Sequence, residues 1–477
     1  MKLSTKFTFL CLAVIFFPIV LAQNGPWPTA PSFYPLYPSR KVIVLNGTWS
    51  FGWSLPGTDA TTVAYSQLTF NTTTFVPSSF DVAPLAIKGP RTTVYYKSTH
   101  SCTPGTTALA RFYAINFYAR VFIDGNFIGN HTAGPYTPFS MILPTCSASG
   151  VREIAIVVNN VFDKNMAPTA TGGDFYFYGG IIRPIVISEL PKSNYFLDRI
   201  EPITVDVGNG LINVNVVLRG QAPSSVMIAL SFNGNSPSSA VSVPVVNGVA
   251  TLTKVTVPNA QPWSLGNGNL FVLTVTDTNT LDALTVRSGL RIIGTTTAAG
   301  GKNGQSRLTI NGEIVKLKGF NRHTMWPDTG AAVTLEQEAI DLEVVKGVNA
   351  NYIRGGHYPQ SQSWLDLLDE NGIAFWEEAL GPGVSTADIN STYFMENQIT
   401  AVTHMVHASI HHPSVILHGF FNEGPSNDPN ACKGYETLSQ TVQNLVGTPA
   451  KALVTWASDK KTSDKCFDSA QVISFNE

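Results

Sequence analysis

The chain has 477 residues, 44% of them hydrophobic and 10% aromatic, so it can bury more than one core and is expected to form about three domains. Thirty Lys and Arg residues stand against 32 Asp and Glu residues, which gives a formal net charge of -2. This balance excludes an electrostatic basis for binding nucleic acid or an anionic membrane surface and favours small or neutral partners, while homo-oligomerisation stays open.

The first 22 residues have the pattern of a secretory signal peptide. A short basic segment precedes an apolar run at residues 7–22 that ends on Val20-Leu-Ala22. The alternative is a membrane anchor, but about 16 apolar residues with Pro18 among them fall short of the roughly 20 that span a bilayer. We therefore expect a chain that begins near Gln23 after cleavage and is secreted or delivered to a lysosome-like or vacuole-like compartment.

Cysteines and glycosylation sequons fit this compartment. The cysteines outside the predicted signal peptide are Cys102, Cys146, Cys432 and Cys466. Their even number predicts two disulfides, and pairing Cys102 with Cys146 and Cys432 with Cys466 is favoured because each bond then closes within one domain. None has a metal-binding spacing, so we expect no metal and no cofactor. N-glycosylation acceptors occur at Asn46, Asn71, Asn130 and Asn390.

The first two-thirds of the chain is expected to be all-β. Between residues 40 and 190, short alternating runs separated by Gly, Pro, Asn and Ser predict a β-sandwich. Asp124-Gly125 predicts a tight hairpin, because a type I′ turn requires positive φ at both positions. A second series of short strands at 193–295 predicts an immunoglobulin-like sandwich, which we interpret as a spacer.

After a Gly-, Thr- and Ala-rich boundary at 296–306, strands alternate with helices. Thr334 and Gln337 have the spacing of a capping box at the start of the first helix. Helices are expected at 334–347, 363–370, 392–408 and 435–445. Strands are expected at 315–319, 350–354, 372–376, 415–421, 452–456 and 471–475. This order is typical of a TIM barrel, which closes with eight strands and about 250 residues. Residues 305–477 are too few, so we expect an incomplete barrel and interpret the chain as a piece of a longer protein.

Polar and titratable residues follow successive strands of this region, at the end where TIM barrels place their chemistry. They are His323, Arg354, His357, Glu377, Glu378, Asn422 and Glu423. A carboxyl group beside an Asn, with His and Arg nearby, suits cleavage of a glycosidic bond, in which one carboxyl protonates the leaving oxygen and a second acts as nucleophile or base. The alternatives are a solvated Glu pair and a core histidine. A second Asn-Glu, at 476–477, is given no role.

Two long motifs resemble signatures of glycoside hydrolase family 2, which contains β-glucuronidases and β-galactosidases. Asn351-Tyr-Ile-Arg-Gly-Gly-His-Tyr-Pro359 resembles the family's first signature, and His412-Pro-Ser-Val-Ile-Leu-His-Gly-Phe-Phe-Asn-Glu423 resembles its acid/base signature. Four earlier segments resemble the family's sugar-binding jelly-roll domain: 45–51, 121–129, 134–139 and 174–183. After the predicted signal peptide at 1–22, the resemblance implies a jelly roll at 23–192, an immunoglobulin-like domain at 193–295 and a partial TIM barrel at 305–477.

The resemblance also implies a function: a secreted, retaining exo-β-glycosidase that hydrolyses the O-glycosyl bond of a terminal β-linked sugar in carbohydrate catabolism. Glu423 matches the general acid/base, and Asn422 matches the residue that bonds the sugar 2-hydroxyl. By the same match the sugar pocket contains Asp174, His323, Arg354, His357 and Glu378. The family's nucleophile, expected after the seventh strand, has no counterpart in this sequence.

Three departures leave the sugar open among glucuronide, galactoside, mannoside and others. His418 stands where Trp is usual, Gly355-Gly356 replaces other small residues, and Thr324 stands where an acidic residue is common. The segments at 174–180 and 377–383 look slightly more like β-glucuronidases. The rival interpretation is a catalytically silent glycan-binding or interaction protein built on the same domains. A third is a prematurely terminated chain that does not fold.

Overall fold

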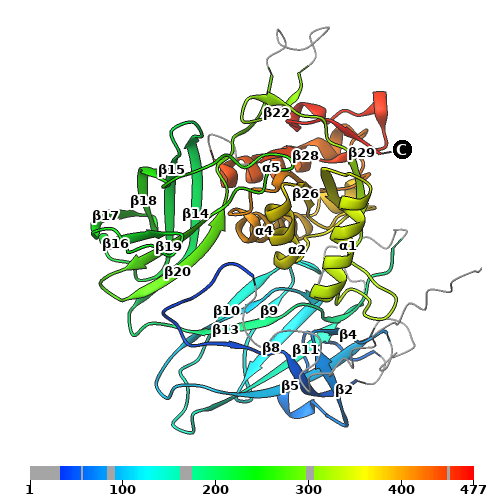
Figure 1. Ribbon diagram of the computed structural model, residues 1–477. Helices are drawn as coiled ribbons and strands as arrows, with labels where there is room; N and C mark the ends of the chain where they lie inside the picture. Colours follow the sequence, from blue (N-terminus) through cyan, green and yellow to red (C-terminus); the bar gives the residue numbers. More distant parts are fainter. Residues whose placement is uncertain are drawn as a thin grey trace, which may run out of the picture.

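The computed structural model describes residues 33–54, 57–82, 92–161, 175–296, 306–447 and 452–476. The predicted signal peptide and Asp174 lie outside these residues. Figure 1 shows two β-domains, in blue to green, and a third part in which helices and strands mix, in yellow to red. No helix within the described ranges is long and apolar enough to cross a membrane.

The N-terminal domain packs two antiparallel sheets face to face. One sheet has the order β1 (Val42–Val44), β13 (Ile185–Glu189), β6 (Ala108–Phe112), β10 (Phe139–Leu143). The other has the order β3 (Thr72–Val76), β2 (Gly47–Trp53), β5 (Thr93–Ser101), β11 (Val151–Asn159), β8 (Tyr118–Ile123), β9 (Asn126–His131). A small third sheet joins β4 (Ser78–Ser79), β12 (Gly180–Ile181) and β7 (Ile115–Asn116). Inward residues such as Trp49, Phe51 and Ile156 fill the core between the two large sheets, which is the expected jelly-roll sandwich.

The predicted hairpin at Asp124-Gly125 is confirmed. Ile123 of β8 pairs with Asn126 of β9, and the two turn residues have φ of 48° and 77°. Positive φ at both central positions is what a type I′ turn requires, and its twist matches that of the flanking strands.

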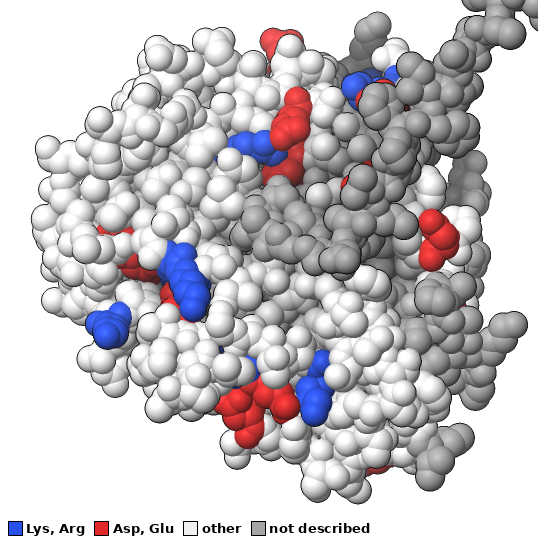
Figure 2. All heavy atoms as spheres, turned by 60° about the horizontal axis from the view of Figure 1, so that its bottom comes forward, with Lys and Arg blue, Asp and Glu red and all other residues white. Residues whose placement is uncertain are grey.

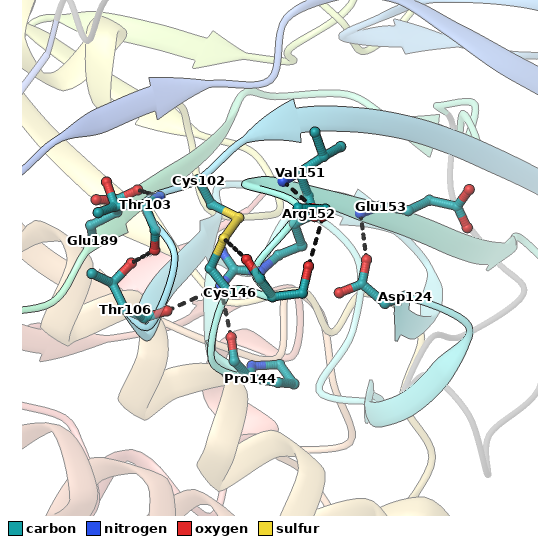
Figure 3. The surroundings of a disulfide bond; sticks show 12 residues. Cys102, Thr103, Thr106, Asp124, Pro144, Cys146, Val151, Arg152, Glu153 and Glu189 are labelled. Carbon is teal, nitrogen blue, oxygen red and sulfur yellow. Dashed lines mark hydrogen bonds between the residues drawn. A yellow bond between two sulfur atoms is a disulfide. The ribbon is translucent and has the colours of Figure 1, made fainter.

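The structure forms both predicted disulfides. Cys102 and Cys146 are 44 residues apart in sequence, and Cys432 and Cys466 are 34 apart. Figure 3 shows the first bond beside Arg152, whose guanidinium donates to the Pro144 carbonyl at 2.6 Å. Closing loops of these lengths restricts the unfolded chain, which stabilises each domain by about 4 kcal/mol.

The second domain is the expected immunoglobulin-like sandwich. Its seven strands are β14 (Tyr195–Asp206), β15 (Leu211–Gly220), β16 (Ser225–Phe232), β17 (Val241–Val246), β18 (Val249–Thr256), β19 (Phe271–Asp277) and β20 (Asp282–Ser288). β17 pairs with β16 at one end and with β18 at the other, and so links the two halves. The last residues of the predicted domain form β21 (Ile293–Thr295), which lies outside these seven strands and pairs with β22 (Leu308–Ile310).

The third part is a parallel sheet with helices on its outside. The sheet has the order β24 (Gly319–Arg322), β25 (Tyr352–Gly355), β26 (Ala374–Glu378), β27 (Val415–Gly419), β28 (Leu453–Thr455). The helices are α1 (Leu335–Gly347), α2 (Gln362–Asn371), α3 (Thr386–Ile389), α4 (Thr392–Ser409) and α5 (Cys432–Val446). The predicted capping box is confirmed, since the Thr334 hydroxyl accepts from the Gln337 N–H and the Gln337 side chain accepts from the Thr334 N–H. Parallel strands that alternate with outer helices form the expected incomplete TIM barrel.

Two strand predictions need correction. The strand expected at 315–319 begins only at Gly319, after the short hairpin strand β23 (Glu313–Ile314). The side-chain amide of Asn351 takes the place of a ladder partner before it, because it donates to the Lys316 carbonyl and accepts from the Lys318 N–H. The strand expected at 471–475 shortens to β30 (Ser474–Phe475), which pairs with β29 (Ala457–Ser458) outside the five-stranded sheet.

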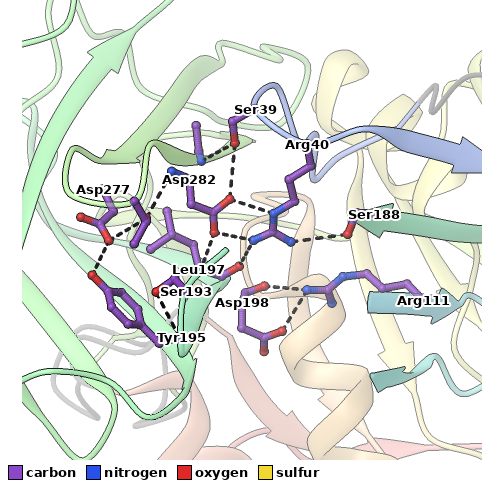
Figure 4. Close-up of polar contacts among 12 residues, drawn as sticks. Ser39, Arg40, Arg111, Ser188, Ser193, Tyr195, Leu197, Asp198, Asp277 and Asp282 are labelled. Carbon is purple, nitrogen blue, oxygen red and sulfur yellow. Dashed lines mark hydrogen bonds and ion pairs between the residues drawn. The ribbon is translucent and has the colours of Figure 1, made fainter. Parts of the chain in front are cut away.

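Buried polar contacts hold the three domains together. In the N-terminal domain, Arg183 donates to the carbonyls of Pro359 and Gln360 in the barrel, and Tyr136 stacks on Tyr358 with ring centroids 3.8 Å apart. Figure 4 shows the junction between the N-terminal domain and the second domain, where Asp282 of β20 binds the Arg40 guanidinium at 2.7 Å. The loop after β25 is therefore packed against the jelly roll.

The charged surface fits the balanced composition. Figure 2 shows one face of the molecule with few charged side chains, and on the described atoms of that face both signs lie scattered among uncharged residues. A face of this kind lacks the single-sign field that attracts polyanions.

Candidate active site

The carboxyl ends of the parallel strands bring the predicted residues to one edge of the sheet. Arg354 lies in β25, Glu378 ends β26, and His323 follows β24 directly. Asn422 and Glu423 follow β27 after two residues. Because these strands are neighbours in parallel register, residues distant in sequence meet at this edge.

Arg354 is the centre of the contacts. Its side chain is 4% exposed, and its guanidinium lies 2.8 Å from a carboxylate oxygen of Glu378. The same guanidinium donates to the Asn422 amide oxygen at 2.6 Å and lies 3.1 Å from Nδ1 of His357. The guanidinium carbon of Arg354 lies over the Trp376 ring, 4.3 Å from the ring centroid. One buried cation thus fixes a carboxylate, an amide and an imidazole relative to one another.

The Glu378 carboxylate is fully buried and ionised. Burial alone would raise its pKa, but the charge of Arg354 and hydrogen bonds from His357 and Arg354 lower the pKa below the ordinary value. One oxygen is bonded to Arg354 and the other lies 3.1 Å from Nδ1 of His357. With both oxygens engaged, Glu378 acts as an anchor for the site.

The backbone around Glu423 is strained, and the Glu423 side chain is exposed beside the site. Phe421 and Glu423 both have φ of 53°, in the left-handed region that non-glycine residues rarely adopt. The Glu423 N–H is held by the Ala457 carbonyl at 2.8 Å, and the flanking residue must be Gly424, because a Cβ there would lie 2.4 Å from the Tyr435 hydroxyl. Such conformations persist where surrounding structure enforces them, and they cluster at functional sites.

Asn476 also belongs to this group, contrary to the expectation that the second Asn-Glu has no role. Its amide donates to the Glu423 carboxylate at 2.7 Å and to the Asn422 oxygen at 3.1 Å, and it accepts from Arg354 at 3.1 Å. The sequence offered one signal that could have found it: Asn476 follows a short apolar run at 472–475, as Asn422 follows β27.

His323 lies in an aromatic wall of the site. Its ring centroid is 5.4 Å from that of His357 and 4.7 Å from that of Phe175, and its Nδ1 is 3.4 Å from the Tyr358 hydroxyl. Phe175 comes from the jelly roll, so that domain contributes to the wall directly. Of the predicted site residues, Asp174 alone lies outside the described residues.

Two of the positions that depart from the family pattern, Gly355 and His418, lie in tightly packed surroundings. A Cβ at Gly355 would lie 2.5 Å from the Phe375 ring, so this position has no room for a side chain. His418 is buried with its Nδ1 3.7 Å from the Glu377 carboxylate. Burial raises the pKa of Glu377 to about 7 and lowers that of His418 to about 3, so the histidine is neutral and the two form no strong ion pair.

One further cluster has the residue types of a metal site. Asp366, Asp369 and His412 have side-chain atoms within 4.8 Å of one another. Protein donors already occupy them, because Asp369 binds the His412 ring at 2.6 Å and the Ser414 N–H at 2.8 Å, and Asp366 binds Arg287 at 2.9 Å. The cluster joins α2 to residues 412–414, which lie between α4 and β27. Its role is therefore structural.

Comparison with known proteins agrees with these features. Residues 302–473 match the family profile described as glycosyl hydrolases family 2, TIM barrel domain. This barrel region belongs to glycoside hydrolase family 2. The fold of the chain is similar to that of a family 2 β-galacturonidase from Eisenbergiella tayi, which superposes with a TM-score of 0.80 at 23% identity over 94% of this chain and 76% of that one.

Curated relatives of the chain have related names. A putative β-glucuronidase of Formosa agariphila is 25% identical over 65% of the chain, and a β-galactosidase of Thermoanaerobacter pseudethanolicus is 27% identical over 58%. A β-glucuronidase of Streptococcus agalactiae is 24% identical over 72% of the chain. The matched part spans 37%, 37% and 60% of these three relatives, respectively.

Proposed function

We propose that this family 2 chain is part of a secreted retaining exo-β-glycosidase, with Glu423 as the general acid/base. The observation that carries the proposal is the arrangement around Asn422-Glu423, in which Asn476 orients the acid and Arg354 orients the neighbouring amide. In this role Glu423 protonates the glycosidic oxygen as the bond breaks and then removes a proton from the attacking water.

Asn422, His357, His323 and Asp174 are proposed to bind the sugar. The Asn422 amide oxygen is fixed by Arg354 and Asn476, which leaves its NH₂ group to donate to a sugar hydroxyl. Arg354 and Glu378 are proposed to hold these sugar-binding side chains in position. A terminal uronide is the first substrate to test, because the similar proteins named above include β-glucuronidases and a β-galacturonidase.

The nucleophile of a retaining reaction must present a carboxylate oxygen to the anomeric carbon from the face opposite the leaving group. Glu378 does not suit this step, because it is fully buried and both its oxygens are bonded. We therefore assign the nucleophile to none of the described residues.

A substrate panel tests the proposal. The chain is incubated with 2,4-dinitrophenyl β-glucuronide, β-galacturonide, β-galactoside and β-mannoside, with and without molar sodium formate, which substitutes for an absent carboxylate nucleophile. We expect release of dinitrophenol from one of the four glycosides. If release occurs without formate, NMR should show the β-anomer of the sugar as the first product. Otherwise release should occur only with formate. An unassisted reaction that gives the α-anomer contradicts the retaining mechanism, and no release in any condition contradicts the activity of this chain.

Substitution of Asn476 tests whether it orients the acid. Asn476→Ala is expected to lower kcat roughly 10-fold, because the acid is no longer held in place, with a smaller change in KM. The loss should also be smaller for a 2,4-dinitrophenyl glycoside than for a 4-methylumbelliferyl glycoside, a difference that a purely structural residue would not produce. Asn444→Ala, on the exposed face of α5, is the matched control, and equal kinetics for the two variants would contradict the role.

A further inference from the structure

A cavity of about 340 Å³ lies where the three domains meet, away from the candidate active site. Its wall includes β6 and β10 of the jelly roll, β14 and β15 of the second domain, and α4 of the barrel. Three positively charged arginines and three histidines line it: Arg111, Arg199, Arg219, His404, His407 and His411. Figure 4 shows Arg111 at this junction, reaching from the jelly roll towards Asp198.

Acidic groups compensate only part of this charge. Asp198 is the one carboxylate in the cavity lining, and it binds Arg111 at 3.1 Å. Arg199 is held by Glu201 at 2.8 Å. Arg219 forms no ion pair within the described part of the chain, where its hydrogen bond goes to the Ser140 hydroxyl at 3.2 Å. The cavity therefore contains an uncompensated guanidinium.

Unused hydrogen-bond donors and acceptors accompany that cation. Among the described residues, Nε of Arg111 and Nδ1 of His404 are buried without a hydrogen-bond partner. His404 and His407 lie one turn apart on the face of α4 that lines the cavity. Burial and the charge of Arg199 lower the pKa of both, to about 4 for His407, so these rings are neutral near pH 7 and can donate or accept.

We propose that this cavity binds a small organic oxyanion, such as a carboxylate or a phosphate ester of sugar size, with Arg219 as its main contact. A guanidinium presents a planar fork of N–H donors that matches carboxylate and phosphate oxygens, and Nε of Arg111 offers a further donor nearby. Phe112, Phe139 and Ile200 provide apolar wall for the rest of the ligand. The bound anion contacts all three domains and so stabilises their docking. This inference does not depend on the proposed glycosidase activity.

Calorimetry and thermal unfolding at constant ionic strength test the site with inorganic phosphate, citrate and glucose 6-phosphate, and with neutral glucose for comparison. We expect at least one anion to bind and to raise the Tm, because a ligand that binds only the folded state stabilises it. Binding of glucose 6-phosphate but not of inorganic phosphate identifies an organic ester, and binding of citrate alone identifies a carboxylate. No binding by any of the three anions overturns the proposal.

Variants locate the binding in this cavity. Arg219→Gln is expected to weaken binding at least 10-fold, whereas Arg307→Gln, an exposed arginine outside the cavity, retains it. Arg219→Lys should give an intermediate affinity, because it keeps the charge but loses the fork. Ala408→Leu fills the cavity without changing its charge and should also abolish binding. An equal Tm increase in the wild type and in both Arg219→Gln and Ala408→Leu identifies a general salt effect and overturns the proposal.

Discussion

Replacing Glu423 by glutamine is expected to lower kcat/KM, which reports the bond-breaking step, for a 4-methylumbelliferyl β-glycoside by roughly 10²–10⁴-fold, because the leaving oxygen then departs without a proton. The loss should be much smaller for a 2,4-dinitrophenyl glycoside of the same sugar, since dinitrophenolate leaves readily without protonation. The fold of the variant should be unchanged, because the Glu423 side chain is exposed and glutamine is nearly isosteric. Steady-state kinetics with the two leaving groups measure the difference.

The matched control is Glu396→Gln, an exposed glutamate on α4 outside the site. It should leave both rates unchanged. If turnover requires formate, the wild type and both variants are measured with the two glycosides in the same formate buffer. A Glu423→Gln variant whose losses are equal for the two leaving groups, or absent, would show that Glu423 is not the acid and would favour the silent glycan-binding interpretation.

Replacing Arg354 by methionine is expected to lower the free energy of unfolding by about 3–5 kcal/mol, because the fully buried Glu378 then loses its counter-charge. In the wild type, the lowered pKa of Glu378 contributes stability that is present above about pH 4.5 and is lost as the pH falls. In the variant, His357 alone opposes the effect of burial, so the pKa of Glu378 rises relative to the wild type and the destabilisation should grow as the pH rises above 4.5. Urea unfolding in mildly acidic and in neutral buffer measures both effects.

Two control variants isolate the buried pair. The double variant Arg354→Met/Glu378→Gln removes the unpaired charge and should recover a large part of the lost stability. Arg199→Met breaks the partly exposed pair with Glu201 and should cost about 1 kcal/mol or less. A destabilisation by Arg354→Met that is independent of pH and is not reduced in the double variant would contradict this account of Glu378.

Sequence patterns predicted the elements well where the signal is local. The hairpin at Asp124-Gly125 and the capping box of Thr334 and Gln337 depend on residues at most three apart, and both form as expected. Predictions failed where a distant partner intervened. The first barrel strand starts late because the Asn351 side chain bonds to residues 33 and 35 positions away.

The candidate site shows the same division. Strand order was enough to predict that Arg354, Glu378, Asn422 and Glu423 share one edge, because parallel strands place their carboxyl ends together. It did not indicate that Arg354 would hold both Glu378 and Asn422, nor that Asn476 would reach Glu423. Those contacts join residues 24, 68 and 53 positions apart, and they depend on rotamers that are set by packing.

The sequence by itself therefore determined the order of the domains, the local turns and caps, and the family signatures around Glu423, since each is written in neighbouring residues. Only the tertiary structure decided which polar groups hold one another and why residue 355 must be glycine. Only the structure, too, places Arg219, which has no ion pair among the described residues, in a cavity between three domains. The reason is physical: periodicity specifies which face of an element is buried, whereas ion pairing and cavity shape arise only when faces from distant parts of the chain meet.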